Sequence, residues 1–145
     1  MVDFGQLGAG LVFGLAAIGS GLGIGIAGQA TVGAWKKCYL ANKSAPMMLL
    51  AFTGNPLTQT FYGYIVMLQM KTAALANAGK GSLYLGYGLA AGLSFLFSAI
   101  IQGKIAANAC EALVEKNKGF AQYMIVMGIA ETVALFTMVL TMTSL

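Results

Sequence analysis

Long apolar stretches separated by short polar breaks make up almost the whole chain. The apolar stretches cover residues 4–34, 46–70, 82–114 and 119–144, and charged residues mark the breaks between them. Each stretch is long enough to supply the ~20 apolar residues that a membrane-spanning helix needs. The pattern therefore predicts an all-α membrane protein with four transmembrane helices, at about 4–35, 46–71, 82–114 and 119–144.

The composition supports this interpretation. Of the 145 residues, 59% are hydrophobic and only 8% are charged, whereas an ordinary soluble domain carries about a quarter charged residues. A water-facing surface of this size is therefore excluded. The eight basic residues are all lysines and are scattered along the chain, so no clustered basic patch for a nucleic-acid partner is expected. Asp3 stands where a secretory signal would be basic, which favours a first helix that is retained.

The lysines also predict which way the helices cross the membrane. Three lysines follow the first predicted helix, three lie in the region where the third one ends, and two lie between the second and the third. Loops rich in lysine tend to stay on the cytoplasmic side of a membrane. We therefore expect both helix-hairpin turns in the cytoplasm and both chain termini outside.

An internal repeat suggests that the four helices form two tandem hairpins, over residues 1–72 and 73–145. A shift of 79 residues places Ile26-Ala27 on Ile105-Ala106 and Ala30 on Ala109, and a shift of 72 places Thr60 on Thr132 and Leu68 on Leu140. The shift of 72 also aligns Gln59 with Glu131. One hairpin would then keep an ionisable carboxylate where the other has its uncharged counterpart.

Small residues line one face of the first predicted helix. Spaced three or four positions apart, they are Gly10, Gly14, Ala17, Gly21, Gly25 and Gly28. Such a face lets helices approach closely in lipid. Because one chain has only four helices, this small-residue stripe favours packing against copies of the same chain in a ring over packing within one chain alone.

The same helix contains a sequence that resembles a dinucleotide-binding motif. Residues 23–28 read Gly-Ile-Gly-Ile-Ala-Gly and match the pattern GxGxxG. The motif requires a preceding strand and an acidic residue about 20 positions later. Here it lies inside an apolar helix, and Met48 stands in the place of the acid. We therefore expect neither a nucleotide site nor an organic cofactor.

Glu131 is the only charged residue deep inside an apolar stretch, and two glutamines share its depth. Gln102 and Glu131 lie 12 residues from the facing ends of the last two predicted helices, which corresponds to ~18 Å. Gln59 lies about 20 Å into the second helix. A single glutamine in a membrane more often links helices than binds a ligand. An ionisable group there usually has a function, because its charge is costly, so the three together favour an ion site.

Further oxygen atoms lie close to Gln59 in the sequence. Thr58 offers a hydroxyl group, and Tyr62 shares a helix face with Gln59. Pro56 has no amide hydrogen and therefore frees a backbone carbonyl one turn earlier. Carboxylate, amide, hydroxyl and carbonyl oxygens suit a hard cation. Because a proton needs only the carboxylate, Na+ is favoured as the transported ion, and H+ stays open as the alternative.

At these residues the sequence resembles the membrane-ring proteolipid, the c or K subunit, of the V-type and bacterial V/A-type rotary ATPases. The resemblance covers essentially the whole chain and is most specific at Phe-Ser-Ala-Ile-Ile-Gln-Gly-Lys, residues 97–104, and Ala-Glu-Thr-Val-Ala, residues 130–134. By resemblance to the sodium-translocating members, the ion ligands are Thr58, Gln59, Gln102, Glu131 and the backbone carbonyl of Asn55, with Tyr62 supporting the carboxylate. The sequence differs from those members at residues 55–57, which read Asn-Pro-Leu instead of an apolar residue followed by Pro-Gly.

The resemblance implies a rotor ring of identical subunits in a bacterial cell membrane, turning against a stator subunit with a buried arginine. A central-shaft subunit would contact the cytoplasmic loops and couple ATP hydrolysis elsewhere in the assembly to Na+ transport on Glu131. The chain itself would be a non-catalytic subunit without an ATP site. Two other interpretations stay open: a small four-helix exchanger that moves cationic drugs against protons, and a structural four-helix membrane protein without transport.

Overall fold

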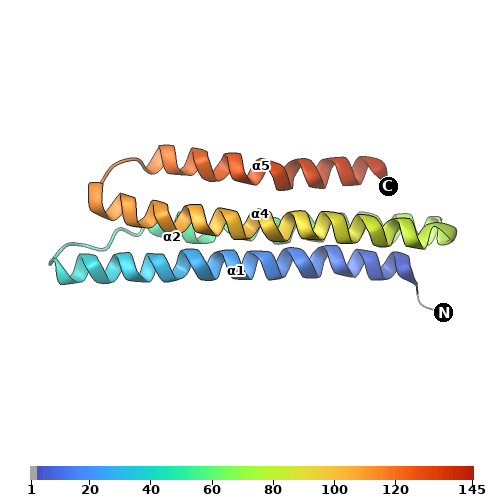
Figure 1. Cartoon of the computed structure of the whole chain (residues 1–145), viewed down its shortest axis with the longest axis horizontal. Helices are drawn as coiled ribbons and strands as arrows, with labels where there is room; N and C mark the ends of the chain where they lie inside the picture. The colour runs from blue at the N-terminus through green and yellow to red at the C-terminus, as the bar shows by residue number, and fades with distance from the viewer. Residues whose placement is uncertain (1–2) are drawn as a thin grey trace.

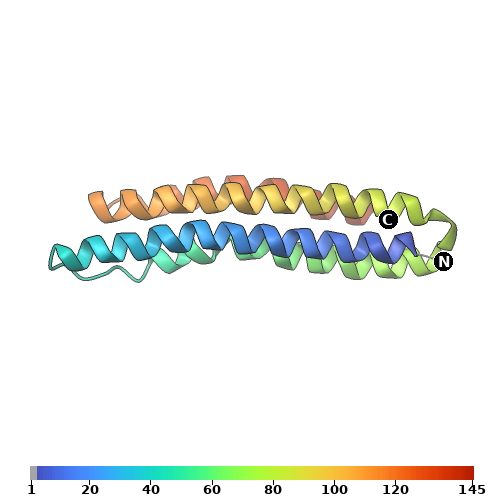
Figure 2. The same ribbon diagram turned by 60° about the horizontal axis from the view of Figure 1, so that its bottom comes forward.

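The computed structural model describes residues 3–145, and within that range the chain is an elongated bundle of helices (Figure 1). In chain order the elements are α1 (Phe4–Leu40), α2 (Leu49–Gly54), the 3-10 turn η1 (Asn55–Leu57), α3 (Thr58–Ala76), the 3-10 turn η2 (Ala78–Lys80), α4 (Gly81–Lys116) and α5 (Phe120–Ser144). α1 and α4 run in one direction along the bundle, and α3 and α5 run back (Figure 2). The prediction of an all-helical chain is confirmed for the described residues; residues 1 and 2 of the predicted first hairpin lie outside them.

Three of the described helices, α1, α4 and α5, are long and apolar enough to cross a membrane. The second predicted helix, at about 46–71, is not continuous, because η1 separates α2 from α3. Pro56 lies in this turn and has no amide hydrogen for a helical hydrogen bond. α3 also carries Gln59, Gln69 and Lys71, which lower its apolar character. The predicted second helix is thus interrupted at the proline whose missing amide hydrogen was expected to free a backbone carbonyl.

Different local features mark the two ends of α1. Asp3 caps the N-terminus, where its carboxylate accepts two backbone N–H bonds. The helix was expected to end near residue 35, before Lys36 and Lys37, but it continues to Leu40. Lysine is a good helix former, so the pair extends the helix into polar surroundings. The chain turns at Asn42, whose φ is +52°.

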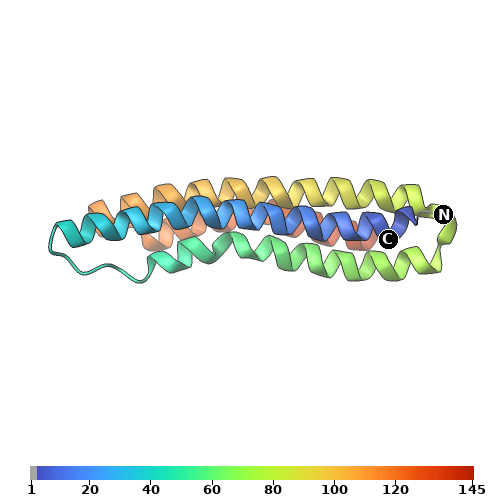
Figure 3. The ribbon, with the colours of Figure 1, turned by 90° about the horizontal axis from the view of Figure 1, so that it is seen from below.

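α1 packs most extensively against α4 and runs parallel to it (Figure 3). Glycines make this approach possible: a Cβ atom at Gly88 would collide with the Gly8 carbonyl, and one at Gly103 would collide with the Gly23 carbonyl. Gly23 belongs to the GxGxxG match, so its role here is packing. Because the main interface joins the first helices of the two predicted hairpins, these hairpins do not pack as separate units.

The small-residue stripe lies on another face of α1. A Cβ atom added at Gly10, Gly14, Gly21 or Gly25 would meet nothing within 4 Å among the described residues, and one at Gly28 would meet a single methyl group at 3.7 Å. The stripe is thus almost unused by the helices of its own chain. Its packing against other copies stays a prediction.

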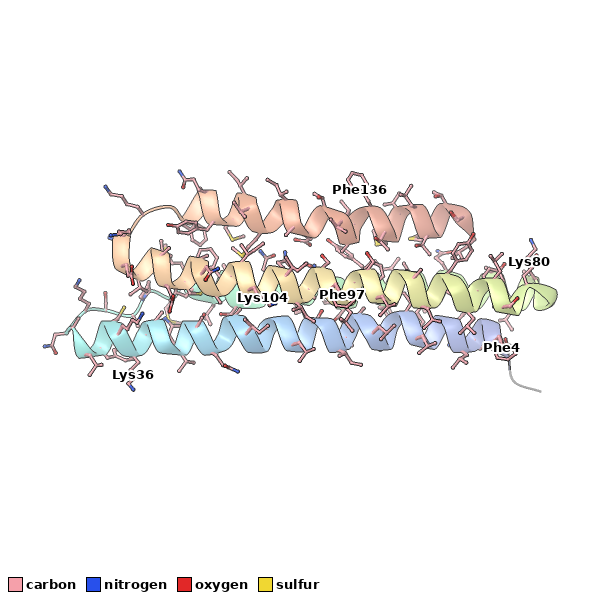
Figure 4. All side chains as sticks on the ribbon, in the orientation of Figure 1. Phe4, Lys36, Lys80, Phe97, Lys104 and Phe136 are labelled. Atoms are coloured by element: carbon pink, nitrogen blue, oxygen red, sulfur yellow. The ribbon has the colours of Figure 1, made fainter. Side chains whose placement is uncertain are left out.

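Large apolar side chains cover the outside of the bundle. Phe97 of α4 and Phe136 of α5 are 58% and 62% exposed, and both project outward (Figure 4). α5 buries only Met127 and Ala134. An apolar outer surface of this extent is expected for a helix bundle whose solvent is lipid.

Candidate functional site

A layer of polar side chains divides the core of the bundle into two apolar clusters. On α1 one cluster holds Ala9, Val12 and Ala16, and the other holds Ala27 and Ala34. The clusters are separated in the same way along the other long helices. The layer between them consists of Ser20 from α1, Gln59 from α3, Ser98 and Gln102 from α4, and Glu131 from α5. This polar layer in an apolar bundle is the candidate site.

Glu131 has a hydrogen-bond donor on each of its carboxylate oxygens. The Tyr62 hydroxyl donates to Oε1 over 2.6 Å, and Gln102 Nε2 donates to Oε2 over 3.3 Å. Both donors are uncharged, so they orient the half-buried carboxylate without cancelling its charge. A bare charge in the membrane interior is costly, and this site therefore calls for a cation or a proton.

Two fully buried glutamines connect the carboxylate to α3. Gln59 Nε2 donates to Gln102 Oε1 over 3.0 Å and to Ser98 Oγ over 3.4 Å. Gln102 Nε2 also donates to the Met127 carbonyl over 3.2 Å. A network in which each amide has several partners fixes the side chains in place. The structure thus brings together the three side chains that were predicted to lie at one depth.

Thr58 and Asn55 extend the network to the turn η1. The Thr58 hydroxyl lies 3.3 Å from Gln59 Oε1 and 3.2 Å from the Asn55 carbonyl oxygen, and it can donate to either. The Thr58 backbone N–H donates to the same carbonyl. The turn therefore gathers a carbonyl, a hydroxyl and an amide oxygen next to one another. The role of these groups as ion ligands stays a prediction.

Ser98 belongs to the layer although the sequence analysis gave it no role. Its hydroxyl donates to the Ala130 carbonyl over 3.2 Å and accepts the bond from Gln59. Ser98 lies one turn before Gln102 on the same helix face, and this spacing could have identified it. Ser20 offered no such signal, because a single serine in a glycine-rich helix has no polar neighbour on its face.

The layer offers several kinds of oxygen around one ionisable group. Within residues 3–145, no three His, Cys, Asp or Glu side chains gather into a metal-binding cluster. One carboxylate among amide, hydroxyl and carbonyl oxygens suits a single hard cation. Its one negative charge balances one monovalent ion.

Fold and site together define the class of protein, an apolar helical membrane proteolipid with one carboxylate held in the polar layer of its bundle. Residues 85–143, which include Gln102 and Glu131, match the family model for the C subunit of ATP synthase. The chain is also 35% identical over 139 residues to the K subunit of the A-type ATP synthase of Methanocaldococcus jannaschii. That match covers 94% of this chain, which spans 60% of the length of the relative. The chain is therefore similar to the c and K subunits of ATP synthases over its apolar helices.

Proposed function

We propose that the chain is a rotor-ring subunit of an A/V-type rotary ATPase and carries Na+ across the membrane on Glu131, coupled to ATP hydrolysis elsewhere in the assembly. The observation that carries this proposal is the setting of Glu131, a half-buried carboxylate oriented by uncharged donors from two other helices. A protein that moves this group past lipid needs a cation on it, because the bare charge is costly there. The similarity to the c and K subunits of ATP synthases supports the same assignment.

The network offers oxygen atoms that can replace the water lost by the ion. In this proposal they come from Glu131, the amides of Gln59 and Gln102, the Thr58 hydroxyl and the Asn55 carbonyl, while Tyr62 holds the Glu131 carboxylate in position. A supporting hydrogen bond of this kind orients a ligand without touching the ion. The 3-10 turn η1 contributes by placing two of these oxygens beside each other.

Gln102 is suited to both the loaded and the unloaded state. With Nε2 directed at Glu131 over 3.3 Å, it stabilises the bare carboxylate. Half a turn of the carboxamide about its last torsion angle would exchange the N–H donor for a carbonyl oxygen, which is a cation ligand. The turn would also break the bonds to Gln59 and to the Met127 carbonyl, so the arrival of the ion would rearrange both glutamines without any movement of the backbone.

The proposed assembly is a ring of identical subunits in the membrane. The small-residue stripe of α1 points away from its own bundle and provides a face for a neighbouring copy. Each copy would contribute two tandem hairpins. In the first hairpin, α2, η1 and α3 together would form the second of the four membrane crossings. The lysine-rich turns between α1 and α2 and between α4 and α5 would lie in the cytoplasm and contact a central-shaft subunit. Both termini would lie outside.

Ion release would take place at a stator subunit with a buried arginine. The guanidinium group would compete with the cation for Glu131, because arginine binds carboxylates through paired, charge-assisted hydrogen bonds. Each ion moved across 100 mV involves ~2.3 kcal/mol. One carboxylate for every four helices means fewer ions per turn for a ring of given girth, so more ATP energy is available for each ion. This arrangement suits pumping.

Labelling of Glu131 by a hydrophobic carbodiimide tests the proposal. In membranes containing the chain, Na+ at fixed pH should slow the labelling, whereas choline at equal ionic strength should not. Glu131→Gln should remove the label, and Glu111→Gln, which changes an exposed carboxylate on α4, should label like the wild type. If lower pH slows the reaction and Na+ never does, the transported ion is H+.

The oligomeric state separates a rotor ring from a small exchanger of cationic drugs and protons. Native mass spectrometry of the detergent-solubilised chain should show a closed ring of many identical subunits. A dimer would contradict the ring and favour the exchanger.

A further inference from the structure

Ser20 is a buried serine on α1 that the proposed mechanism has not used. Its side chain is only 2% exposed. Among the buried polar side-chain atoms of residues 3–145, its hydroxyl oxygen is the one without a hydrogen-bond partner. An unsatisfied hydroxyl in an apolar interior is costly, so a partner from outside the chain is expected.

The neighbours of Ser20 on α1 show which way its face is turned. One turn earlier, Ala16 lies against Gly63 of α3, and one turn later, Gly23 lies against the Ala99 carbonyl of α4 and Pro56 of η1. Ser20 therefore lies where α1 borders both α4 and the stretch of chain between Pro56 and Gly63. Ala16 belongs to one apolar cluster and Ala27 to the other, so Ser20 lies between them, in the polar layer.

Gln59 is the buried polar residue of that stretch. Both hydrogens of its Nε2 are used, by Ser98 and Gln102. Its Oε1 accepts one bond, from Thr58, and a carbonyl oxygen has two lone pairs. Gln59 thus keeps one free acceptor position in the polar layer to which Ser20 also belongs. A hydroxyl without a polar atom in direct reach can connect to such a position through one water molecule.

We propose that Ser20 is a positioning residue of the ion site, whose hydroxyl binds a water molecule that bridges to Gln59 Oε1. This bridge holds the Gln59 carboxamide in place, and Oε1 becomes available to the cation when Thr58 turns its hydrogen to the Asn55 carbonyl. α1 would then contribute to ion binding as well as to packing. The inference rests on the proposed function only in taking Glu131 as the carrier of a cation or a proton.

The test compares Ser20→Ala with the wild type in the carbodiimide assay. The change removes one hydroxyl and almost no volume. We expect the Na+ concentration that gives half-maximal protection of Glu131 to rise about fivefold, as the loss of one water-mediated hydrogen bond implies. A purely structural serine predicts no shift. Ser20→Gly, which also lacks the hydroxyl, should give the same shift and serves if the alanine variant does not assemble.

Thr31→Ala is the matched control on the same helix. Thr31 is also buried, but its hydroxyl has partners, Thr53 Oγ1 at 2.7 Å and Cys110 Sγ at 3.2 Å. It lies ~16 Å further along α1. This variant should unfold more easily and keep the wild-type protection curve.

The outcomes separate the inference from the proposed function. If the wild type responds to pH and never to Na+, the sodium assignment fails, and Ser20→Ala is then judged by the shift of its pH midpoint of labelling. A midpoint or protection curve identical to that of the wild type overturns the role of Ser20. An equal shift in Thr31→Ala also overturns it, because the effect would then be a general consequence of disturbing α1.

Discussion

Replacing Gln102 with leucine would remove the central connection of the polar layer with little change in volume. The wild-type side chain accepts a bond from Gln59 at 3.0 Å and donates to the Met127 carbonyl at 3.2 Å and to Glu131 at 3.3 Å. A neutral hydrogen bond contributes about 1 kcal/mol, and one to a charged group contributes more. The three together amount to about 3 to 4 kcal/mol, offset in part by the burial of the leucine side chain.

Gln102→Leu should weaken the binding of Na+ much more than the binding of H+. Sodium loses an amide oxygen ligand, and the interaction of such a group with a charge is worth up to about 3 kcal/mol, which corresponds to roughly a hundredfold change in affinity. A proton binds the carboxylate alone and needs no amide ligand. We therefore expect the half-protecting Na+ concentration in the carbodiimide assay to rise by about two orders of magnitude, while the pH midpoint of labelling changes far less.

Gln69→Leu provides the control for this experiment. Gln69 lies on the same bundle but is exposed on α3, so its replacement should leave both curves unchanged. Equal losses of Na+ and H+ binding in Gln102→Leu would refute the assignment of Gln102 as an ion ligand. Unchanged Na+ protection would refute it as well.

The remaining predictions concern the carboxylate, its hydroxyl donor and the packing of the bundle. Glu131→Gln should abolish ion transport in reconstituted vesicles while the ring stays assembled, and any measurable transport counts against the mechanism. Tyr62→Phe removes a 2.6 Å bond to a carboxylate, worth about 1.5 to 3 kcal/mol. It should raise the half-protecting Na+ concentration at least about tenfold, and normal protection would show that this bond is not needed. Gly103→Leu would drive a side chain into the Gly23 carbonyl and should lower thermal stability by more than the ~1–3 kcal/mol typical of overpacking. Gly86→Leu, at an open position on α4, should melt like the wild type.

α1 shows how one helix can serve two interfaces. Its glycines at positions 8 and 23 meet glycines of α4 inside the bundle, whereas those at 10, 14, 21 and 25 face outward. Both sets allow backbones to approach closely in lipid, where small residues replace the hydrophobic driving force that water would supply. The pattern read from the sequence captured only the outward set. The inward-facing glycines contributed only to the high glycine content of the sequence, and their spacing predicted no interface.

The sequence by itself determined the helical, lipid-facing character of the chain and the position of its one deep carboxylate. Hydropathy and helical periodicity are local properties, and the rise of a helix is constant, so counting residues was enough to place Gln59, Gln102 and Glu131 at one level. The same local reasoning failed where a charge was taken as the end of α1, because lysine does not break helices.

Only the tertiary structure decided which groups meet. The hydrogen bonds that link Gln59 to Gln102, and Tyr62 and Gln102 to Glu131, join residues 29 to 69 positions apart, and no local pattern specifies such contacts. The pairing of α1 with α4, the division of the second predicted helix at Pro56, and the places of Ser98 and Ser20 in the polar layer all depend on which helix faces turn toward each other. Those faces are selected by close packing across the whole bundle, where a single added methyl group at Gly23 or Gly103 would not fit.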